Sequence, residues 1–384
     1  MFLESTITRN RELIETAFSF HTEGKIEPNT YLLDLDNILK NARAIKEKAD
    51  KLGIDLFFMT KQIGRNPYVA KKLMELGYKG AVVVDFEEAQ VMMKNNIPIC
   101  NVGHLVQIPS RLVKKIVSYG VDFITVYSIE KLREVNAAAK ELNIKQKIMI
   151  RVLNSNHVIY PGQAGGFYKD DIKKIVEELK SLDHVELVGL TTFPCFLYDE
   201  KEKKVKATRN VGSLKEIQEE FKNNNINISE LNMPSVTCIQ TLDLINELGG
   251  TQGEPGHALT GTTPDVNGVE IPSMVYVSEI SHNFQGQAYC FGGGYYRRGH
   301  LEDALVGKTM DSSKKVKAIA PTPESIDYHI AISEECQVGD TVIMVFRTQI
   351  FVTRSKVAIV EGLSQGKPII SSIYNSLGEL IKEY

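Results

Sequence analysis

The sequence lacks tryptophan, and its few cysteines lack any regular spacing. The five cysteines are odd in number and scattered over the chain, at Cys100, Cys195, Cys238, Cys290 and Cys336. Zinc sites need Cys and His at close, repeated intervals, and small secreted folds need an even, paired cysteine framework. Neither pattern is present, so we expect a reduced, cytoplasmic protein without a bound metal.

Long apolar runs and a dominant charge are also missing. No stretch approaches 18 consecutive apolar residues, which excludes an ordinary membrane span. The first residues, MFLESTITRN, include an acidic side chain and no continuous apolar core, unlike a secretory signal. The net charge is only -3, and the one dense charged run lies at residues 200–206. The sequence therefore indicates neither a membrane nor a nucleic acid as partner.

The sequence does contain a regular alternation of strand-like and helix-like segments from residue 30 onward. The expected strands cover residues 31–36, 56–61, 81–85, 99–104, 123–128, 147–153, 185–193 and 228–236. Eight such repeats match the size of a closed parallel (β/α)8 barrel, typically about 250 residues. A doubly wound open sheet is the competing fold, but no Gly-rich dinucleotide fingerprint follows the first strand. The sequence favours the barrel.

After residue 261 the pattern changes to short alternating runs such as MVYVSEI, DTVIMVF and IFVTRSKVAIVEG. Their β-branched residues and intervening Gly and Pro are typical of an antiparallel β domain. We therefore expect three parts: residues 1–29 as an N-terminal segment that packs on the β domain, residues 30–265 as the barrel, and residues 266–384 as the C-terminal β domain.

One lysine ends a buried apolar run. In DLFFMTKQIGRNP the strand-like residues stop at Lys61, and Gly64 and Pro67 follow within a loop. Barrels keep their active sites at the carboxyl ends of their strands. Burial there would lower the pKa of an amine and make it a nucleophile toward carbonyl groups, as a Schiff base requires. A lysine that merely ends a strand and points to water is the alternative.

A barrel with such a lysine, followed by a β domain, resembles the fold type III pyridoxal phosphate (PLP) enzymes. These include alanine racemase and the ornithine and diaminopimelate decarboxylases. FFMTKQIGRNP is similar in sequence and position to the YhfX-type amino-acid racemase branch, and the resemblance covers about residues 28 to 384. It implies that Lys61 binds PLP covalently, at the end of the second barrel strand.

The resemblance also implies a set of cofactor-binding residues. GEPGHALTG is similar to the segment after the eighth strand of these enzymes, where Gly256 and His257 would lie beside the phosphate. Ser235, in LNMPSVTC, falls where the racemases place a phosphate-binding serine, although a turn or helix cap is its ordinary role. Arg151 could orient the cofactor or form a surface ion pair.

Glu254 is the clearest difference from the alanine racemases. They carry an arginine at the matching position, whereas the decarboxylases carry a glutamate that keeps the pyridine nitrogen of PLP protonated. A carboxylate there makes the ring a deeper electron sink. This resemblance implies a site that stabilises negative charge at Cα better than an alanine racemase does.

Racemisation also needs an acid or base on the second face of Cα. In alanine racemases this is a tyrosine from the β domain of the partner subunit, in a segment similar to AYCFGGGYYRRGH. Alignment of the glycines puts Phe291 at the matching place, so the chain departs from the family there. Among the nearby tyrosines Tyr289, Tyr295 and Tyr296, we choose Tyr295. Packing and turn formation are the alternative roles for this segment.

These features together indicate a PLP-dependent amino-acid racemase or epimerase that exchanges the Cα proton and acts as a homodimer. A PLP-dependent decarboxylase or lyase on the same fold is one alternative, which Glu254 favours. A non-catalytic PLP-binding protein is another, but that class usually lacks the β domain. The sequence does not name the amino acid, because one methylene changes discrimination by only about 1–3 kcal/mol.

Overall fold

The structure, a computed structural model, describes residues 1–265 and 268–384. The chain divides into two compact units, each built from separate segments. We call them the barrel unit (Ala44–Thr60 and Ala70–Gly256) and the β unit (Met1–Arg43, Lys61–Val69 and His257–Tyr384). The chain passes from one unit to the other four times, at Arg43–Ala44, Thr60–Lys61, Val69–Ala70 and Gly256–His257.

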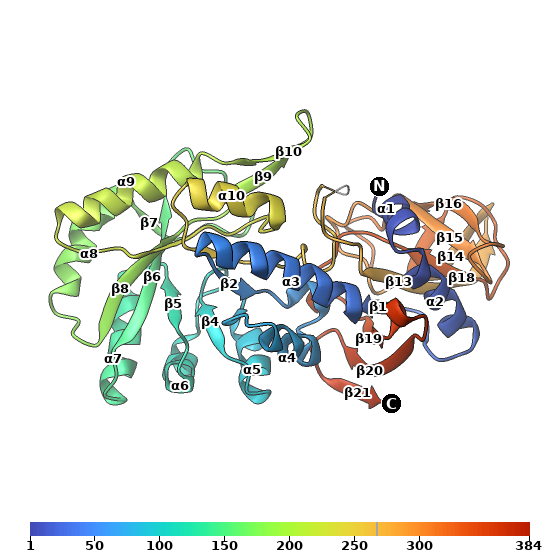
Figure 1. The fold of residues 1–384 in the computed structure, drawn as a ribbon, viewed down its shortest axis with the longest axis horizontal. Coiled ribbons are helices and arrows are strands. Elements are labelled where there is room, and N and C mark those ends of the chain that lie inside the picture. Colours follow the sequence, from blue (N-terminus) through green and yellow to red (C-terminus); the bar gives the residue numbers. More distant parts are fainter. Residues whose placement is uncertain (266–267) are drawn as a thin grey trace. The chain divides into compact units, whose positions relative to one another are not determined.

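The barrel unit contains eight parallel strands that close on themselves, because β5 pairs with β6 and β12 pairs with β2 (Figure 1). In order around the barrel they are β2 (Asp55–Phe58), β3 (Gly80–Val82), β4 (Ile99–Val102), β5 (Phe123–Val126), β6 (Gln146–Leu153), β8 (Val185–Thr191), β11 (Glu230–Asn232) and β12 (Gln252–Gly253). This arrangement confirms the predicted fold class of an eight-stranded barrel joined to an antiparallel β domain.

Helices alternate with the barrel strands as expected, starting with one that precedes the first strand, β2. They are α3 (Leu35–Leu52), α4 (Pro67–Glu75), α5 (Phe86–Lys94), α6 (Val113–Tyr119), α7 (Ile129–Glu141), α8 (Ile172–Leu179), α9 (Asn210–Asn223) and α10 (Ile239–Glu247). Several of them, including α5 and α7, begin with the side-chain caps that short polar residues provide. Asp85 accepts a hydrogen bond from the Glu88 amide at α5, and Ser128 accepts one from the Lys131 amide at α7. Short strands β7 (Phe167–Tyr168), β9 (Phe196–Asp199) and β10 (Lys204–Ala207) lie outside the closed ring.

The predicted first barrel strand, residues 31–36, is wrong. Strand β1 (Thr30–Asp34) pairs antiparallel with β13 and parallel with β19, both in the β unit. All five of its residues are buried. A short strand buried on both faces reads as a continuous apolar run in either kind of sheet, so its sequence pattern does not say which sheet it joins. The barrel starts at β2, and Lys61 therefore follows the first barrel strand, not the second.

The β unit is built around a ten-stranded sheet in the order β14-β17-β16-β15-β18-β13-β1-β19-β20-β21 (Figure 1). Apart from β1, its strands are β13 (Met274–Phe284), β14 (Gln287–Phe291), β15 (Asp303–Gly307), β16 (Lys314–Ile319), β17 (His329–Ile332), β18 (Thr341–Met344), β19 (Lys356–Glu361), β20 (Ile369–Asn375) and β21 (Leu380–Glu383). All of their neighbouring pairs are antiparallel except β1 with β19. The predicted boundary between the barrel and the β domain, between residues 265 and 266, falls where residues 266 and 267 lie outside the described residues.

The N-terminal helices α1 (Phe2–Arg9) and α2 (Arg11–Thr22) belong to the core of the β unit. Apolar side chains of both helices, including Leu13, Ile14 and Phe18, form one buried cluster with Val275 and Val277 of β13. Burying a side chain of this size fully is worth about 1.5–3 kcal/mol. Packing of this kind attaches the first residues of the chain to its C-terminal half.

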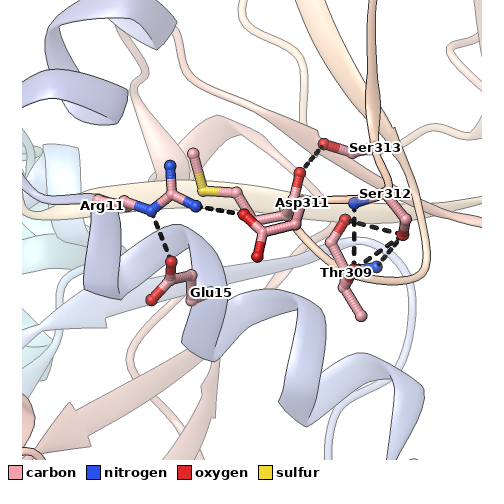
Figure 2. Close-up of polar contacts among 7 residues, drawn as sticks. Arg11, Glu15, Thr309, Asp311, Ser312 and Ser313 are labelled. Atoms are coloured by element: carbon pink, nitrogen blue, oxygen red, sulfur yellow. Dashed lines mark hydrogen bonds and ion pairs between the residues drawn. The ribbon is translucent and has the colours of Figure 1, made fainter.

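Surface ion pairs add to the same attachment (Figure 2). The Arg11 guanidinium donates from Nη2 to Asp311 in the loop between β15 and β16, and from Nε to Glu15 on its own helix, each at 2.6 Å. The loop is closed by hydrogen bonds between Thr309 and Ser312. Arg11 and Asp311 are 48% and 88% exposed, and exposed pairs typically contribute about 0–1 kcal/mol. The buried apolar cluster, not this pair, therefore determines where α2 lies.

Candidate functional site

Buried polar side chains gather at the carboxyl ends of the barrel strands. The Thr125 hydroxyl donates to Asn101 Oδ1 at 2.8 Å, which joins β5 to β4. On β8 and β11, Thr191 donates to Asn232 Oδ1, also at 2.8 Å. All four side chains are fully buried. Polar groups persist inside a core only where they bond one another or a ligand, so this layer has the character of a site rather than of ordinary packing.

Glu254 lies directly after β12 and is almost fully buried, at 5% exposure. Its Oε1 accepts a hydrogen bond of 3.0 Å from Asn232, and its backbone amide donates to the Thr237 hydroxyl at 2.9 Å. The other carboxylate oxygen, Oε2, is 3.8 Å from Nε2 of His104. The carboxylate is thus fixed by its neighbours on β11 and β4. It also raises the pKa of the Cys195 thiol, whose burial is the larger cause.

Arg151, on β6, is a fully buried arginine whose hydrogen-bonding capacity is incompletely used. Its Nη1 donates to the Tyr127 hydroxyl at 2.8 Å, and its guanidinium carbon lies 5.3 Å from the centre of that ring. Within the described residues, its Nε and Nη2 atoms have no hydrogen-bond partner, and neither does the buried Thr192 hydroxyl. A buried guanidinium strongly favours acceptor oxygens, so these donors fit the oxygen atoms of a ligand.

The loop after β11 has an unusual backbone. Ser235 and Val236 both have positive φ, 92° and 50°, which is uncommon for residues other than glycine and is a true outlier for a β-branched residue such as Val236. The Ser235 hydroxyl donates to the Phe196 carbonyl at 2.8 Å, and α10 starts three residues beyond Val236. Strained backbone that leads into a helix N-terminus is a common arrangement for binding an anion.

In the β unit, Lys61 is the first residue of a short 3-10 helix, η1 (Lys61–Ile63). This turn packs against a second one, η4 (Ile350–Val352), and the Arg65 guanidinium lies over the Phe351 ring at 5.1 Å. Gly64 makes the close approach possible: its φ is 70°, and a Cβ there would lie 3.1 Å from both Ile350 and Val357. The turn that carries Lys61 is therefore held in one conformation by its packing.

His257 occupies the same unit and has a partner on each ring nitrogen. Its Nδ1 is 3.0 Å from the Thr262 hydroxyl, and its Nε2 is 3.4 Å from the Gln349 amide nitrogen. Burial lowers the pKa of His257 well below its usual range, and the nearby cations Arg347 and Lys61 lower it further. A neutral ring accepts from Gln349 at Nε2 and donates from Nδ1 to Thr262. His257 thus marks a place where two cationic side chains converge.

Tyr295 lies in the β unit beyond β14. Its ring packs edge-on against Phe346 at 5.7 Å, and its hydroxyl donates to the Arg297 carbonyl at 3.3 Å. Burial raises the pKa of Tyr295, and Asp327 raises it further. Phe291, which takes the matching place of the racemase tyrosine, is 38% exposed. The side chain on the second face of Cα stays a prediction.

The predicted residues thus fall into two groups. Arg151, Ser235 and Glu254 lie at the carboxyl ends of β6, β11 and β12 in the barrel unit, where Glu254 and the loop of Ser235 are joined through Thr237. Gly256 ends that unit, and His257 and Lys61 share an electrostatic environment in the β unit.

Several supporting residues were not predicted. Asn232, Tyr127, Arg347 and Gln349 contact or adjoin the predicted ones, but their partners lie far away in sequence. Asn232 did carry one usable signal, a polar side chain between the apolar residues Leu231 and Met233. Among the described residues, no three His, Cys, Asp or Glu side chains form a cluster able to hold a metal ion. A helix with the length and hydrophobicity of a membrane span is likewise absent from the described part of the chain.

Comparison with solved structures shows the same fold in enzymes of different activities. An alanine racemase from Clostridium difficile 630, in complex with cycloserine, matches with a TM-score of 0.63 and 18% identity, over 90% of this chain and 98% of that one. A D-threonine aldolase from Filomicrobium marinum matches with a TM-score of 0.65 and 13% identity, over 92% of this chain and 95% of that one. A diaminopimelate decarboxylase from Helicobacter pylori, in complex with L-lysine, matches with a TM-score of 0.63 and 13% identity, over 90% of this chain and 94% of that one.

Sequence comparison is more specific. Residues 33–264 match the alanine racemase N-terminal domain, and residues 275–370 match the YhfX-like C-terminal domain. The uncharacterized protein YhfX of Escherichia coli (strain K12) is 43% identical over 383 residues, which covers 98% of this chain and 99% of that protein. The chain therefore belongs to the alanine racemase family of PLP-fold enzymes, in the branch with a YhfX-like C-terminal domain.

Proposed function

We propose that the protein is a PLP-dependent amino-acid racemase or epimerase. The observation that supports a cofactor most directly is the buried polar layer of the barrel. It presents an arginine with two unused donors, Arg151, and a fixed buried carboxylate, Glu254. The ring hydroxyl of PLP would bind Arg151, and its ring nitrogen would pair with Glu254. Family membership and the lysine after β2 support the same cofactor.

In this proposal Lys61 attaches the cofactor covalently and Glu254 pairs with the protonated ring nitrogen. Arg151 binds the ring hydroxyl, while Ser235, Gly256 and His257 bind the phosphate. The Ser235 hydroxyl, which bonds Phe196, would rotate to donate to a phosphate oxygen. Bound PLP would supply an electron sink for the electrons released at Cα of an amino acid.

The chain's own residues would then carry the proton. Lys61 would remove or return the Cα proton of the bound amino acid on one face. Tyr295 of a second copy serves the other face, so we propose a homodimer that shares its sites. The high pKa that burial gives Tyr295 suits a group that donates a proton.

A PLP-dependent decarboxylase or lyase is the second candidate, and Glu254 favours it. A carboxylate at this position strengthens the electron sink, which helps the loss of carbon dioxide as much as the loss of a proton. The two activities are separated by incubating the purified protein with single enantiomers of amino acids. Circular dichroism of the substrate reports inversion at Cα, and a carbon dioxide assay reports decarboxylation. Inversion without carbon dioxide supports the racemase, and carbon dioxide release contradicts it.

The covalent attachment is tested with Lys61→Ala. We expect the parental protein, treated with PLP and borohydride, to carry the reduced cofactor on the peptide that contains Lys61, as mass spectrometry reads it. Lys61→Ala should lose this adduct, whereas Lys71→Ala, which removes an exposed lysine of α4, should keep it. A borohydride-stable adduct elsewhere in the parental protein would overturn the role of Lys61.

A further inference from the structure

His104 is a buried histidine at the carboxyl end of β4 that the proposed mechanism leaves unused. The glycine before it fixes its direction. Gly103 has φ of 90°, and a Cβ there would lie 2.3 Å from the Thr125 carbonyl oxygen, so only glycine lets the chain lie against β5 at this point. The His104 ring that follows is 1% exposed and packs edge-on against Phe193, with 5.7 Å between ring centres.

The imidazole faces the carboxylate of Glu254. Its Nε2 lies 3.8 Å from Glu254 Oε2, and both side chains are 1% exposed. At this distance and burial the two groups affect each other's charge strongly, because little water screens them. Asn232 fixes the opposite carboxylate oxygen at 3.0 Å, so the carboxylate lies between an amide and an imidazole.

The backbone of His104 contacts Tyr127, the partner of Arg151. Its carbonyl oxygen accepts a hydrogen bond from the Tyr127 hydroxyl, which in turn accepts from Arg151 at 2.8 Å. The ring of His104 thus lies beside the Glu254 carboxylate, while its carbonyl oxygen binds the Tyr127 hydroxyl that accepts from Arg151. The Cys195 thiol is also near Glu254, and burial together with that carboxylate raises the pKa of the thiol and keeps it neutral.

We propose that His104 is a positioning residue for Glu254, which it keeps ionised and oriented toward the ring nitrogen of the cofactor. This rests on the proposed role of Glu254. A protonated imidazole beside the carboxylate makes an ion pair, and a neutral one removes that charge from the surroundings of Glu254. The charge available to the cofactor therefore depends on His104, which acts through Glu254.

The pairing is tested first in the full-length, cofactor-free protein, which separates it from the proposed function. The pH titration of the His104 ring is followed by NMR of 15N-histidine-labelled protein, before and after Glu254→Gln. Loss of the neighbouring carboxylate should move the titration midpoint to lower pH, with a fall in proton affinity of about tenfold. His184, elsewhere in the barrel unit, is the internal control and should keep its midpoint. A His104 midpoint that does not move overturns the pairing.

The second arm uses the PLP-loaded protein and two variants. His104→Gln keeps a donor near Glu254, whereas His104→Phe keeps the ring shape and the contact with Phe193 but has no donor. We expect His104→Phe to change the pH midpoint of the cofactor absorbance by at least a unit, with PLP affinity altered less than threefold. His104→Gln should restore the parental midpoint in large part. A folded His104→Phe protein with the parental midpoint would overturn the proposal. Failure of every protein to bind PLP would instead count against the proposed function, and the NMR arm would still decide the pairing.

Discussion

At the scale of single residues, the polar layer at the carboxyl ends of the barrel strands includes a buried carboxylate, Glu254. An isolated charge in a low-dielectric interior is strongly unfavourable, so Glu254 requires compensation from its surroundings. Asn232 supplies a donor to one oxygen, and Thr191 in turn fixes Asn232. The layer orients Glu254 before any ligand arrives, which is the arrangement that electrostatic catalysis needs.

We predict that Glu254→Gln slows exchange of the Cα proton about ten- to a hundredfold while PLP stays bound. The reason is the loss of a charge-assisted hydrogen bond, typically worth about 1.5–3 kcal/mol. Replacement of the Cα proton of the best substrate by deuterium is followed by NMR in deuterated water. Glu230→Gln, which changes a carboxylate at the amino end of β11, is the control and should exchange at the parental rate. Parental exchange in the Glu254 variant would show that the electron-sink argument is wrong.

The candidate residues with distinctive neighbours could be predicted from the sequence. Lys61 ends an apolar run, and Glu254 precedes a Pro-Gly pair, so both were visible in local context. Gln349 and Tyr127 were not, because their importance comes from partners 92 and 24 residues away. Such partners meet only through the tertiary fold, which local patterns do not encode.

At the scale of secondary-structure elements, the predicted count of eight barrel strands was correct, and the membership was wrong at both ends. Strand β1 was assigned to the barrel because a strand buried on both faces looks alike in every sheet. Strand β12 was missed because its two residues, Gln252 and Gly253, are too few to show any periodicity. Very short strands that close a ring depend on their neighbours for register, so the sequence carries little trace of them.

The strained loop after β11 gives a prediction for cofactor retention. Ser235→Ala should weaken PLP binding about two- to tenfold, because the hydroxyl would donate to the phosphate and a lost hydrogen bond is worth about 0.5–1.5 kcal/mol. The fold should be unaffected, as the side chain bonds only the Phe196 carbonyl among described contacts. Equilibrium dialysis with PLP measures the change. Ser229→Ala, at an exposed position, should retain PLP normally. Equal affinities would remove Ser235 from the phosphate site.

The turn that carries Lys61 gives a prediction for stability. Gly64→Ala should destabilise the protein by about 2–3 kcal/mol, because alanine is strained at φ of 70° and its Cβ would crowd Ile350 and Val357. Gly24→Ala is a matched control: φ is 69°, but nothing lies within 4 Å, so only the backbone strain of about 1 kcal/mol applies. Urea unfolding of both variants measures the difference. Equal losses of stability in the two variants would show that the side chains around Gly64 move to accommodate the added methyl group.

At the scale of the whole molecule, buried neutral histidines make the fold sensitive to acid. His157 bonds the Ser213 hydroxyl at 2.8 Å, and burial, followed by the charges of Arg151 and Arg209, lowers its pKa to about 4. The unfolded chain binds this proton with a pKa near 6.5. Between about pH 6.5 and 4 the unfolded state therefore holds more protons, and stability falls as the pH falls. His257, in the β unit, acts in the same direction.

We predict that His157→Gln flattens this dependence. The parental free energy of unfolding should fall between pH 7 and pH 5 by an amount to which His157 contributes on the order of 1–2 kcal/mol. The variant should lose that part of the slope, and His300→Gln, at an exposed position, should not. Urea unfolding at the two pH values measures it. A variant with the full parental slope would show that His157 is not held neutral.

The place of β1 in the centre of the β unit has a consequence for biosynthesis. Strand β1 ends at Asp34, but its partner β13 starts at Met274 and its partner β19 at Lys356. Ribosomes add roughly 5–20 residues per second, so the strand waits on the order of 10–50 s for its first neighbour. Throughout that interval an apolar strand with open edges is outside the ribosome before the strands that will pair with it have been made. Protection of the nascent N-terminus, by a chaperone or by α1 and α2, is therefore a condition for producing this protein in good yield.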